Sequence, residues 1–242
     1  ASLVVNRSAE LMRSLLGGAA YDTPSPELER LIERAASFTA QPAGEDAAHF
    51  LRLYKPIGIL PPDQYMALVL QLTEGCSFNT CTFCTFYRDR PFHIKSPDEF
   101  RAHIAAVREY MGDSMALRRG IFLADANALV APQDRLAPLF QIVRDMGSES
   151  TVPMFAFLDG FSGRKKSAED YAELAALGLR RVYIGMESGH APLLEWLRKP
   201  GRAQDVMEAA RAIKAGGVNV CVIVLLGAGG SRYAEGHVRD TI

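Results

Sequence analysis

Long hydrophobic runs are missing from this sequence of 242 residues. The longest apolar stretch, residues 218–228, falls well short of the roughly 20 residues that a membrane-spanning helix needs. The first residues also lack the layout of a signal peptide, because Asn6, Arg7 and Glu10 interrupt any apolar segment there. We therefore expect a protein without a membrane anchor, and the cytoplasm is its expected location.

A strong charge of either sign is missing as well. The chain has 27 basic and 28 acidic side chains, which give a formal net charge of −1. No global electric field therefore draws the chain to nucleic acid or to an anionic membrane. Apolar residues make up 48% of the sequence, which is typical of an ordinary globular protein with a sizeable core.

Cysteine is scarce, and the four cysteines are too few for a disulfide scaffold. Three of them, Cys76, Cys81 and Cys84, lie within nine residues of one another. In a reducing compartment, such crowding indicates metal binding rather than disulfide formation. The fourth, Cys221, lies in the middle of an apolar run, so we expect an ordinary buried thiol there.

The first part of the chain carries helical signals. Apolar residues recur at helical spacing over 8–16 and 26–38, and Ser25-Pro26-Glu27 supplies an N-cap, a first-turn proline and an early acid. The segment Gln41-Pro42-Ala43-Gly44 is expected to break this pattern. We expect residues 1–65 to form a helical extension of the main domain.

From residue 66 onward, short apolar runs alternate with amphipathic helical stretches. The strand-like runs are 67–72, 120–123, 152–157, 181–184 and 218–226. The helical stretches are 97–111, 136–146, 168–177 and 203–215. Such alternation predicts repeated βαβ units around a parallel sheet, with right-handed crossovers that curl it into a barrel. We expect an α/β fold over 66–242, a partial (βα)6-type TIM-like barrel that is either short or cut at its C-terminal end.

The clustered cysteines follow the first strand-like run in the spacing C-x4-C-x2-C. They therefore occupy a loop at the C-terminal end of a strand, which is the face where α/β barrels place their active sites. Structural zinc prefers four protein ligands, whereas a cubane with three thiolates keeps one iron open for a chelating ligand. The alternative is a zinc knuckle in which His93 supplies the fourth ligand.

The loop Gly75-Cys76-Ser77-Phe78-Asn79-Thr80-Cys81-Thr82-Phe83-Cys84 resembles the cluster loop of the radical S-adenosylmethionine (SAM) superfamily. Its spacing is one residue longer than the commonest form and resembles an elongator-like and coproporphyrinogen-dehydrogenase-like branch. The resemblance implies that the three cysteines hold a [4Fe–4S] cluster and that SAM is the second cofactor. It further implies that Phe83, Phe86 and Tyr87 contact SAM, although core packing of the loop would also explain the last two.

The resemblance extends along the later strands. Asp125 and Asn127 lie where many members of the superfamily hold the amino group of SAM, but an Asx turn is the alternative. Glu187 and Ser188 belong to a Gly-x-Glu-Ser-Gly segment whose glutamate reaches the ribose or amino group of the cofactor. The remaining positions that the resemblance assigns to SAM are Arg198, or its neighbour Lys199, for the carboxylate, and Val224 and Gly227 beside the adenine.

The function implied by this resemblance is reductive cleavage of SAM to a 5′-deoxyadenosyl radical that abstracts hydrogen from a substrate. An oxygen-sensitive enzyme of this kind needs an external electron donor of the flavodoxin or ferredoxin type. The near-neutral charge favours a small-molecule or peptide substrate over nucleic acid. The alternatives are an iron–sulfur electron carrier, a zinc-stabilised binding module and, among enzymes, RNA modification.

Overall fold

The computed structural model describes residues 2–17, 25–146, 152–161 and 165–242. The chain divides into two compact units, Ala1–Lys55 and Pro56–Ile242. This division lies a little before the boundary expected after residue 65. That the first unit serves the second as an extension stays a prediction.

Three helices form the first unit: α1 (Ser2–Gly17), α2 (Pro26–Ser37) and α3 (Ala40–Leu53). The predicted N-cap is confirmed, because the Ser25 hydroxyl accepts the backbone N–H of Leu28 at 3.2 Å. The Arg13 guanidinium of α1 donates to the Ala36 carbonyl of α2 at 3.2 Å, so these two helices are joined by a polar contact as well as by apolar packing.

The prediction that residues 41–44 break the helical pattern is wrong. Helix α3 begins at Ala40 and runs through this segment. Pro42 falls in its first turn, where a backbone N–H has no partner within the helix, so the missing donor costs nothing. Its fixed φ is also already helical.

A parallel five-stranded sheet in the order β1-β4-β5-β6-β7 forms the centre of the second unit. Its strands are β1 (Leu68–Gln71), β4 (Ile121–Ala124), β5 (Met154–Leu158), β6 (Leu179–Glu187) and β7 (Asn219–Val224). Each new strand adds to the same edge of the sheet, as successive βαβ units require. The predicted α/β architecture of a partial barrel is confirmed.

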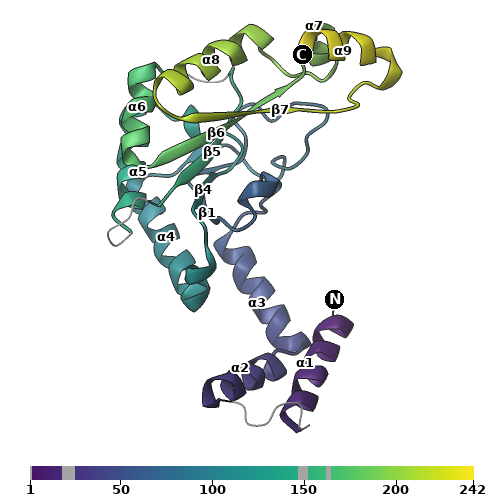
Figure 1. The fold of residues 1–242 in the computed structure, drawn as a ribbon, viewed down its shortest axis with the longest axis vertical. Coiled ribbons are helices and arrows are strands. Elements are labelled where there is room, and N and C mark those ends of the chain that lie inside the picture. Colours follow the sequence, from purple (N-terminus) through teal and green to yellow (C-terminus); the bar gives the residue numbers. More distant parts are fainter. Residues whose placement is uncertain (1, 18–24, 147–151, 162–164) are drawn as a thin grey trace. The chain divides into compact units, whose positions relative to one another are not determined.

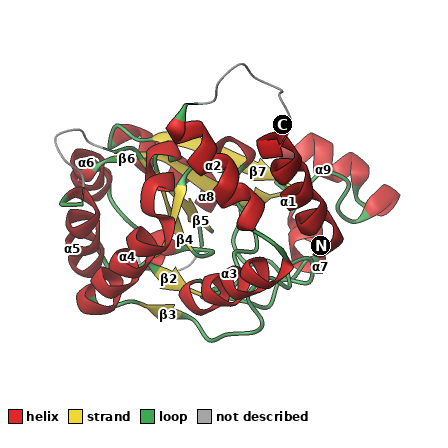
Figure 2. Cartoon of the chain, turned by 90° about the horizontal axis from the view of Figure 1, so that it is seen from below, coloured by secondary structure: helices red, strands yellow, loops and turns green. Residues whose placement is uncertain are grey.

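Helices cover one face of this sheet in chain order. They are α4 (Pro97–Met111), α5 (Gln133–Arg144), α6 (Ala168–Leu177) and α8 (Ala203–Ala215), and each contacts the next (Figures 1 and 2). β1 and β4 are buried along their whole length, which explains why all their residues except Gln71 are apolar. Because all strands are parallel, their C-terminal ends meet at one edge of the sheet, and the site is built there.

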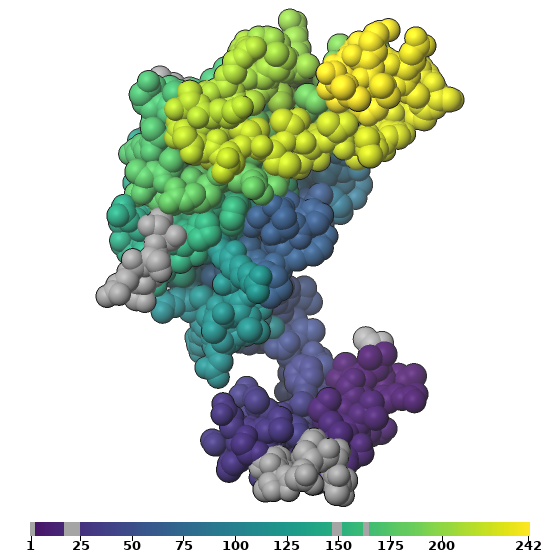
Figure 3. Space-filling view, viewed as in Figure 1, coloured from purple at the N-terminus to yellow at the C-terminus, as the bar shows by residue number. Residues whose placement is uncertain are grey.

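Two shorter helices complete this unit: α7 (Ala191–Trp196) and α9 (Ala234–Thr241). α9 lies at the surface, in yellow in Figure 3, with Val238 exposed. No helix within the described part of the chain is long and apolar enough to cross a membrane.

The expectation that Cys221 is a buried thiol is wrong, since its side chain is exposed. β7 is the last strand of the sheet and pairs with β6 on one side only. Its apolar composition is that of a buried strand, but its place at the edge leaves several of its side chains in contact with solvent.

His103 connects α4 to the end of the first strand. Its Nε2 accepts the backbone N–H of Gln71 at 3.1 Å, which requires an unprotonated nitrogen. The pKa of His103 is lowered to about 4, mainly by burial and also by the Lys95 ammonium, while the Glu74 carboxylate opposes the shift. The folded protein therefore holds this ring neutral over a wide pH range.

We expect this neutral ring to make stability depend on pH. The ring in the unfolded chain takes up a proton near its ordinary pKa of about 6.5, whereas the folded state resists until about pH 4. Stability is therefore complete above about pH 6.5 and falls by about 2–3 kcal/mol as the pH falls toward 4. A His103→Gln variant, whose amide oxygen can accept the same N–H without titrating, should lose less stability over this range in urea unfolding. Equal pH slopes for the two proteins would contradict this explanation.

Candidate functional site

The three clustered cysteines lie on a loop whose two ends are joined by a short ladder. β2 (Thr73–Glu74) pairs antiparallel with β3 (His93–Ile94), so residues 75–92 leave and return at one place. Gly75 has a φ of 78°, and a Cβ on it would lie 2.8 Å from the Pro91 carbonyl oxygen. The two ends of the loop therefore touch, and glycine allows both this approach and the left-handed backbone.

The thiols of Cys76, Cys81 and Cys84 are free and half-buried. The backbone N–H of Asn79 donates to the Cys76 sulfur at 3.3 Å. Burial raises the pKa of Cys81, and the Lys199 ammonium opposes this. Three soft thiols on one loop fit the donor set of a [4Fe–4S] cluster, in which each thiolate binds a different iron.

A site for a single metal ion finds less support. Within the described residues, no three His, Cys, Asp or Glu side chains, the loop cysteines included, are gathered closely enough to hold one metal ion. The proposed fourth ligand of a zinc knuckle, His93, instead directs its Nε2 toward both carboxylate oxygens of Glu99, at 3.2 Å each. Structural zinc would need a closed set of four ligands.

The cysteine loop is attached to the ends of other strands and helices. The backbone N–H of Thr82 donates to the Leu197 carbonyl just after α7, at 2.9 Å. The Phe78 ring meets the Phe161 ring, which follows β5, edge to face at 5.5 Å between centroids. The loop is therefore held against the C-terminal edge of the sheet on the side of β5 and β6.

Glu187 ends β6 as a buried acid. Its backbone has a φ of 64°, at an irregularity in the pairing of β6 with β7. Burial raises the pKa of Glu187, and the Lys199 ammonium, whose Nζ lies 3.6 Å from Oε1, opposes this. A buried carboxylate with one loosely spaced cation has the capacity to accept further hydrogen bonds from a ligand.

The structure brings Lys199, rather than Arg198, to this acid. The Lys199 side chain is 8% exposed, and its ammonium lies 5.1 Å from the centre of the Phe161 ring. Arg198 is exposed and has a φ of 51°, so it forms the turn that directs its neighbour inward. Sequence reasoning named both residues, and only the turn geometry distinguishes them.

Ser188 is fully buried and faces helix α9. Its hydroxyl lies 2.8 Å from His237 Nδ1 and accepts the backbone N–H of His190 at 2.9 Å. Thr241 adds a bond by accepting the Gly189 N–H at 2.9 Å. His237 and Thr241 thus connect α9 to the turn after Glu187.

Asp125, directly after β4, is almost completely buried among protein donors. Its carboxylate accepts hydrogen bonds from the Gln71 side chain, the Gly75 backbone and the Arg90 guanidinium, at 3.0, 3.0 and 3.2 Å. Burial raises the pKa of Asp125, and these hydrogen bonds and the Arg90 charge oppose the shift. Its role toward SAM stays a prediction, because the observed contacts hold the cysteine loop.

Asn127 is 1% exposed, and its side-chain nitrogen lies 3.4 Å from the Ser77 hydroxyl of the cysteine loop. Its Oδ1 has no hydrogen-bond partner among the described residues. Buried acceptors are rarely left without a donor. Asn127 is therefore better placed than Asp125 to accept a hydrogen bond from a ligand.

The aromatic residues of the loop differ in their surroundings. Tyr87 is buried beneath the Arg90 guanidinium, 5.3 Å from the ring centre, and burial raises the pKa of its hydroxyl. Phe83 and Phe86 are partly exposed. The burial of Tyr87 fits the alternative that it packs the core of the loop. Phe83 and Phe86 have exposed surface that a ligand could contact.

Val224 and Gly227 lie where β7 ends, beside the acid of β6. The backbone N–H of Leu225 donates to the Glu187 carbonyl at 2.9 Å, which joins the two strand ends. Gly227 has a φ of 75°, and a Cβ there would meet nothing within 4 Å. The glycine serves the turn, and the space around it is open.

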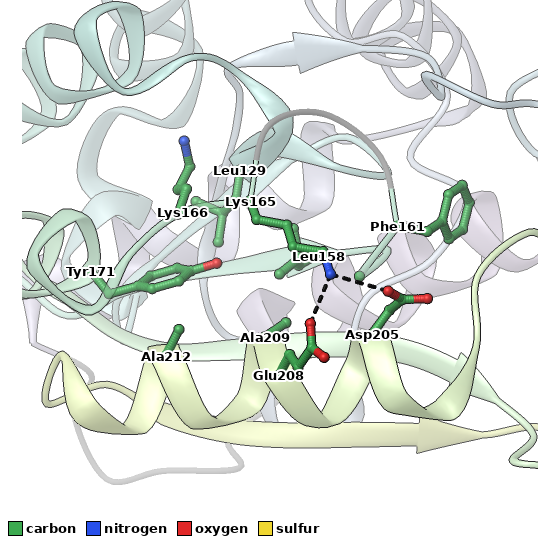
Figure 4. Close-up of a pocket in the computed structure, with 11 residues that line it drawn as sticks. Leu129, Leu158, Phe161, Lys165, Lys166, Tyr171, Asp205, Glu208, Ala209 and Ala212 are labelled. Carbon is green, nitrogen blue, oxygen red and sulfur yellow. Dashed lines mark hydrogen bonds and ion pairs between the residues drawn. The ribbon is translucent and has the colours of Figure 1, made fainter.

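A cavity of about 220 Å³ lies beside this site, between α6, α8 and the end of β5 (Figure 4). Its wall includes Phe161, which contacts the cysteine loop, and the Tyr171 side chain of α6. Lys165 spans it to Asp205 and Glu208 of α8, at 3.1 and 2.8 Å, as the dashed lines in Figure 4 show. The charges within the cavity are thereby largely paired.

Solved structures with a similar fold include proteins described as radical SAM enzymes. OxsB, a cobalamin-dependent S-adenosylmethionine radical enzyme, has a TM-score of 0.56 and 19% identity over 72% of this chain and 26% of its own. Methylornithine synthase (PylB) has a TM-score of 0.52 and 16% identity over 96% of this chain and 59% of its own. The radical S-adenosylmethionine methyltransferase TsrM from Kitasatospora setae has a TM-score of 0.52 and 14% identity over 77% of this chain and 36% of its own. At these identities the likeness shows the fold.

The chain spans about a quarter of OxsB and about three-fifths of PylB. None of the curated proteins matches it in sequence. Residues 70–238 match the family described as the Radical SAM superfamily. This range includes the cysteine loop and the C-terminal ends of all five strands. This family uses a [4Fe–4S] cluster and SAM, for which the loop supplies a suitable donor set. Since the match covers well over half of the chain, this protein belongs to the radical SAM superfamily.

Proposed function

We propose that this chain is the core of an enzyme in which Cys76, Cys81 and Cys84 hold a [4Fe–4S] cluster that acts on SAM. The observation that carries the proposal is the position of three free thiols on a closed loop, one of which, Cys81, lies within electrostatic reach of the buried Glu187 and Lys199. The chemistry that such a cluster supplies is reductive cleavage of SAM to a 5′-deoxyadenosyl radical, which abstracts hydrogen from a substrate.

The residues around the loop supply the groups that SAM requires. Glu187 is suited to its ribose hydroxyls or ammonium group, and the unpartnered Oδ1 of Asn127 to the ammonium group. Lys199, with Arg198 as the alternative, would hold the carboxylate through a charge-assisted hydrogen bond. Phe83, Phe86, Val224 and Gly227 would contact SAM through apolar side chains or backbone. Tyr87 and Ser188 are buried and would hold the site in place rather than contact SAM.

We propose a small-molecule or peptide substrate rather than nucleic acid. The net charge of −1 supplies no global attraction to a phosphate backbone. RNA modification is the alternative that this charge disfavours. The electron would come from an external donor of the flavodoxin or ferredoxin type.

A finer assignment to the elongator-like and coproporphyrinogen-dehydrogenase-like branch is also proposed. It rests on the C-x4-C-x2-C spacing, which is one residue longer than the commonest form. A simple electron carrier is the competing function, but such clusters normally have four cysteine ligands. The fourth cysteine of this chain, Cys221, lies in the middle of an edge strand.

The direct test is reconstitution of the protein with iron and sulfide without oxygen, followed by dithionite and SAM. Formation of 5′-deoxyadenosine, measured by mass spectrometry, would support the proposed enzyme. A cluster that forms but never cleaves SAM would support the electron carrier instead. Firmly bound zinc in place of iron would support the binding module.

A Glu187→Gln variant is expected to bind SAM about 10- to 100-fold more weakly, because it loses charge-assisted hydrogen bonds worth about 1.5–3 kcal/mol. The measurement is titration calorimetry of the reconstituted protein with SAM. Glu195→Gln, the same change at an exposed position of α7, is the control and should bind like the wild type. Equal affinities for all three proteins would remove Glu187 from the proposed SAM site.

A further inference from the structure

The buried carboxylate of Asp125 lies where the two ends of the cysteine loop meet. Oδ2 accepts the backbone N–H of Gly75, the residue before Cys76, at 3.0 Å. The same oxygen accepts from the guanidinium of Arg90, near the other end of the loop, at 3.2 Å. Oδ1 accepts from the Gln71 side chain at the end of β1, at 3.0 Å. One side chain after β4 thus holds the start and the end of a loop that follows β1.

The backbone of Asp125 takes part in the same attachment. Its N–H donates to the Thr73 hydroxyl of β2 at 3.0 Å. Thr73 pairs with Ile94 in the ladder that closes the loop. Asp125 therefore contacts the loop base through both its main chain and its side chain.

Arg90 extends this attachment into the loop and to the start of the second unit. Its guanidinium donates to the Pro56 carbonyl at 2.6 Å and to the Asp89 carboxylate at 2.9 Å, and it stacks over the Tyr87 ring. The Tyr87 carbonyl in turn accepts from the Asn79 side chain at 2.7 Å. Asn79 is the residue whose backbone N–H donates to the Cys76 sulfur, so a chain of contacts leads from Asp125 to a proposed ligand.

The electrostatics of this pair indicate a geometric role. The side chains of Arg90 and Asp125 are 5% and 2% exposed, and removing two such charges from water costs several kcal/mol per ion. A well-packed apolar pair would often be as stable, so stability alone does not explain an ion pair here. What a hydrogen-bonded ion pair adds is direction, since its donors and acceptors fit in one arrangement only.

We propose that Asp125 and Arg90 are positioning residues that clamp residues 75–92 in the conformation that receives the cluster, before any iron is bound. The proposal rests on the proposed function for the identity of the cluster, but the clamp itself is a property of the iron-free chain. It assigns Asp125 to the loop rather than to SAM, because its carboxylate already accepts three protein donors. The clamp limits the entropy that the loop would otherwise lose when the three thiolates converge on a cluster.

The test compares hydrogen exchange in the iron-free wild type and an Asp125→Asn variant. The amide is isosteric but neutral. If its oxygen keeps facing the Gly75 N–H and the Arg90 guanidinium, its NH2 group meets the NH2 of Gln71 and the bond to Arg90 loses its charge assistance; if it is turned round, a donor meets both Gly75 and Arg90. We expect amides of residues 75–92 to exchange about 10-fold faster or more, with the remaining strands of the sheet unchanged. We also expect less iron to be incorporated on reconstitution, and alkylation of the three thiols in the iron-free protein to become faster.

Asp63→Asn is the matched control. Asp63 also accepts from a tyrosine and an arginine, Tyr183 at 2.6 Å and Arg181 at 2.7 Å, but it lies before β1, away from the loop. It should leave loop exchange and iron uptake as in the wild type. If Asp125→Asn exchanged like the wild type over 75–92, or if both variants loosened the whole sheet equally, the clamp would be disproved.

A milder variant keeps the proposal testable if Asp125→Asn does not fold. Arg90→Lys retains the charge but loses the planar fork that reaches Asp125 and Pro56 together. Faster exchange confined to the loop would support the clamp, and wild-type exchange would overturn it. If the wild type took up no iron, the proposed function would fail, while the exchange comparison would still decide the clamp.

Discussion

A Cys81→Ala variant is expected to lose its iron–sulfur absorbance and at least ~100-fold of its SAM cleavage. Loss of a residue that only hydrogen-bonds a metal ligand typically costs about 10- to 100-fold, and loss of a ligand itself should cost more. Three thiols are the whole ligand set that the loop provides, so removing one leaves an iron without a protein ligand. Cys81 is also the thiol within reach of both Glu187 and Lys199. The measurement is 5′-deoxyadenosine formed after anaerobic reconstitution and reduction, with the visible spectrum recorded on the same sample.

Cys221→Ser provides the control for this experiment. It removes a thiol of the same chemistry from the exposed edge strand β7, outside the cysteine loop. It should keep the spectrum and the rate of the wild type. SAM cleavage that survives in Cys81→Ala, or that disappears equally in both variants, would show that the loop is not the cluster site.

A Gly189→Ala variant is expected to lower the free energy of unfolding by about 3 kcal/mol. This is the upper end of the usual cost of adding atoms to a well-packed core. A Cβ on Gly189 would lie 1.9 Å from the backbone carbonyl oxygen of Asp240. Backbone cannot rotate away as a flexible side chain can, so α9 would have to move from the end of β6. That movement would also break the Gly189–Thr241 hydrogen bond and disturb the contact between Ser188 and His237. Urea unfolding of the purified variant measures the loss.

The same substitution at Gly44 should have the opposite sign. Gly44 lies inside α3, and a Cβ there meets nothing within 4 Å. Alanine is favoured over glycine in a helix by about 0.8–1 kcal/mol, so the variant should be slightly more stable. A Gly189→Ala protein as stable as the wild type would mean that α9 does not pack tightly against the turn after Glu187.

The strands were predictable because their sequence pattern has one physical cause. A strand buried on both faces, such as β1 or β4, is apolar at nearly every position, so it stands out against the amphipathic helices around it. The cysteine loop was equally accessible, since its ligands are neighbours in sequence. The position of Glu187 followed from the strand-like run 181–184 of the strand that it ends.

What the sequence did not show depends on contacts between distant segments or on position within the sheet. The roles of Asp125 and Arg90 arise from hydrogen bonds across 35 residues or more, which no local pattern encodes. Cys221 has the neighbours of a core residue, and only the order of the strands exposes it. Pro42 has the form of a helix breaker, and only its place in a first turn makes it harmless.

The ladder between β2 and β3 makes the cysteine segment a cassette. Its two ends are fixed one strand spacing apart, about 4.8 Å, whatever lies between them. A residue added or removed inside the cassette therefore shifts the thiols relative to one another without altering the register of the barrel strands. The spacing of the cysteines can thus change while the sheet that presents the site keeps its arrangement.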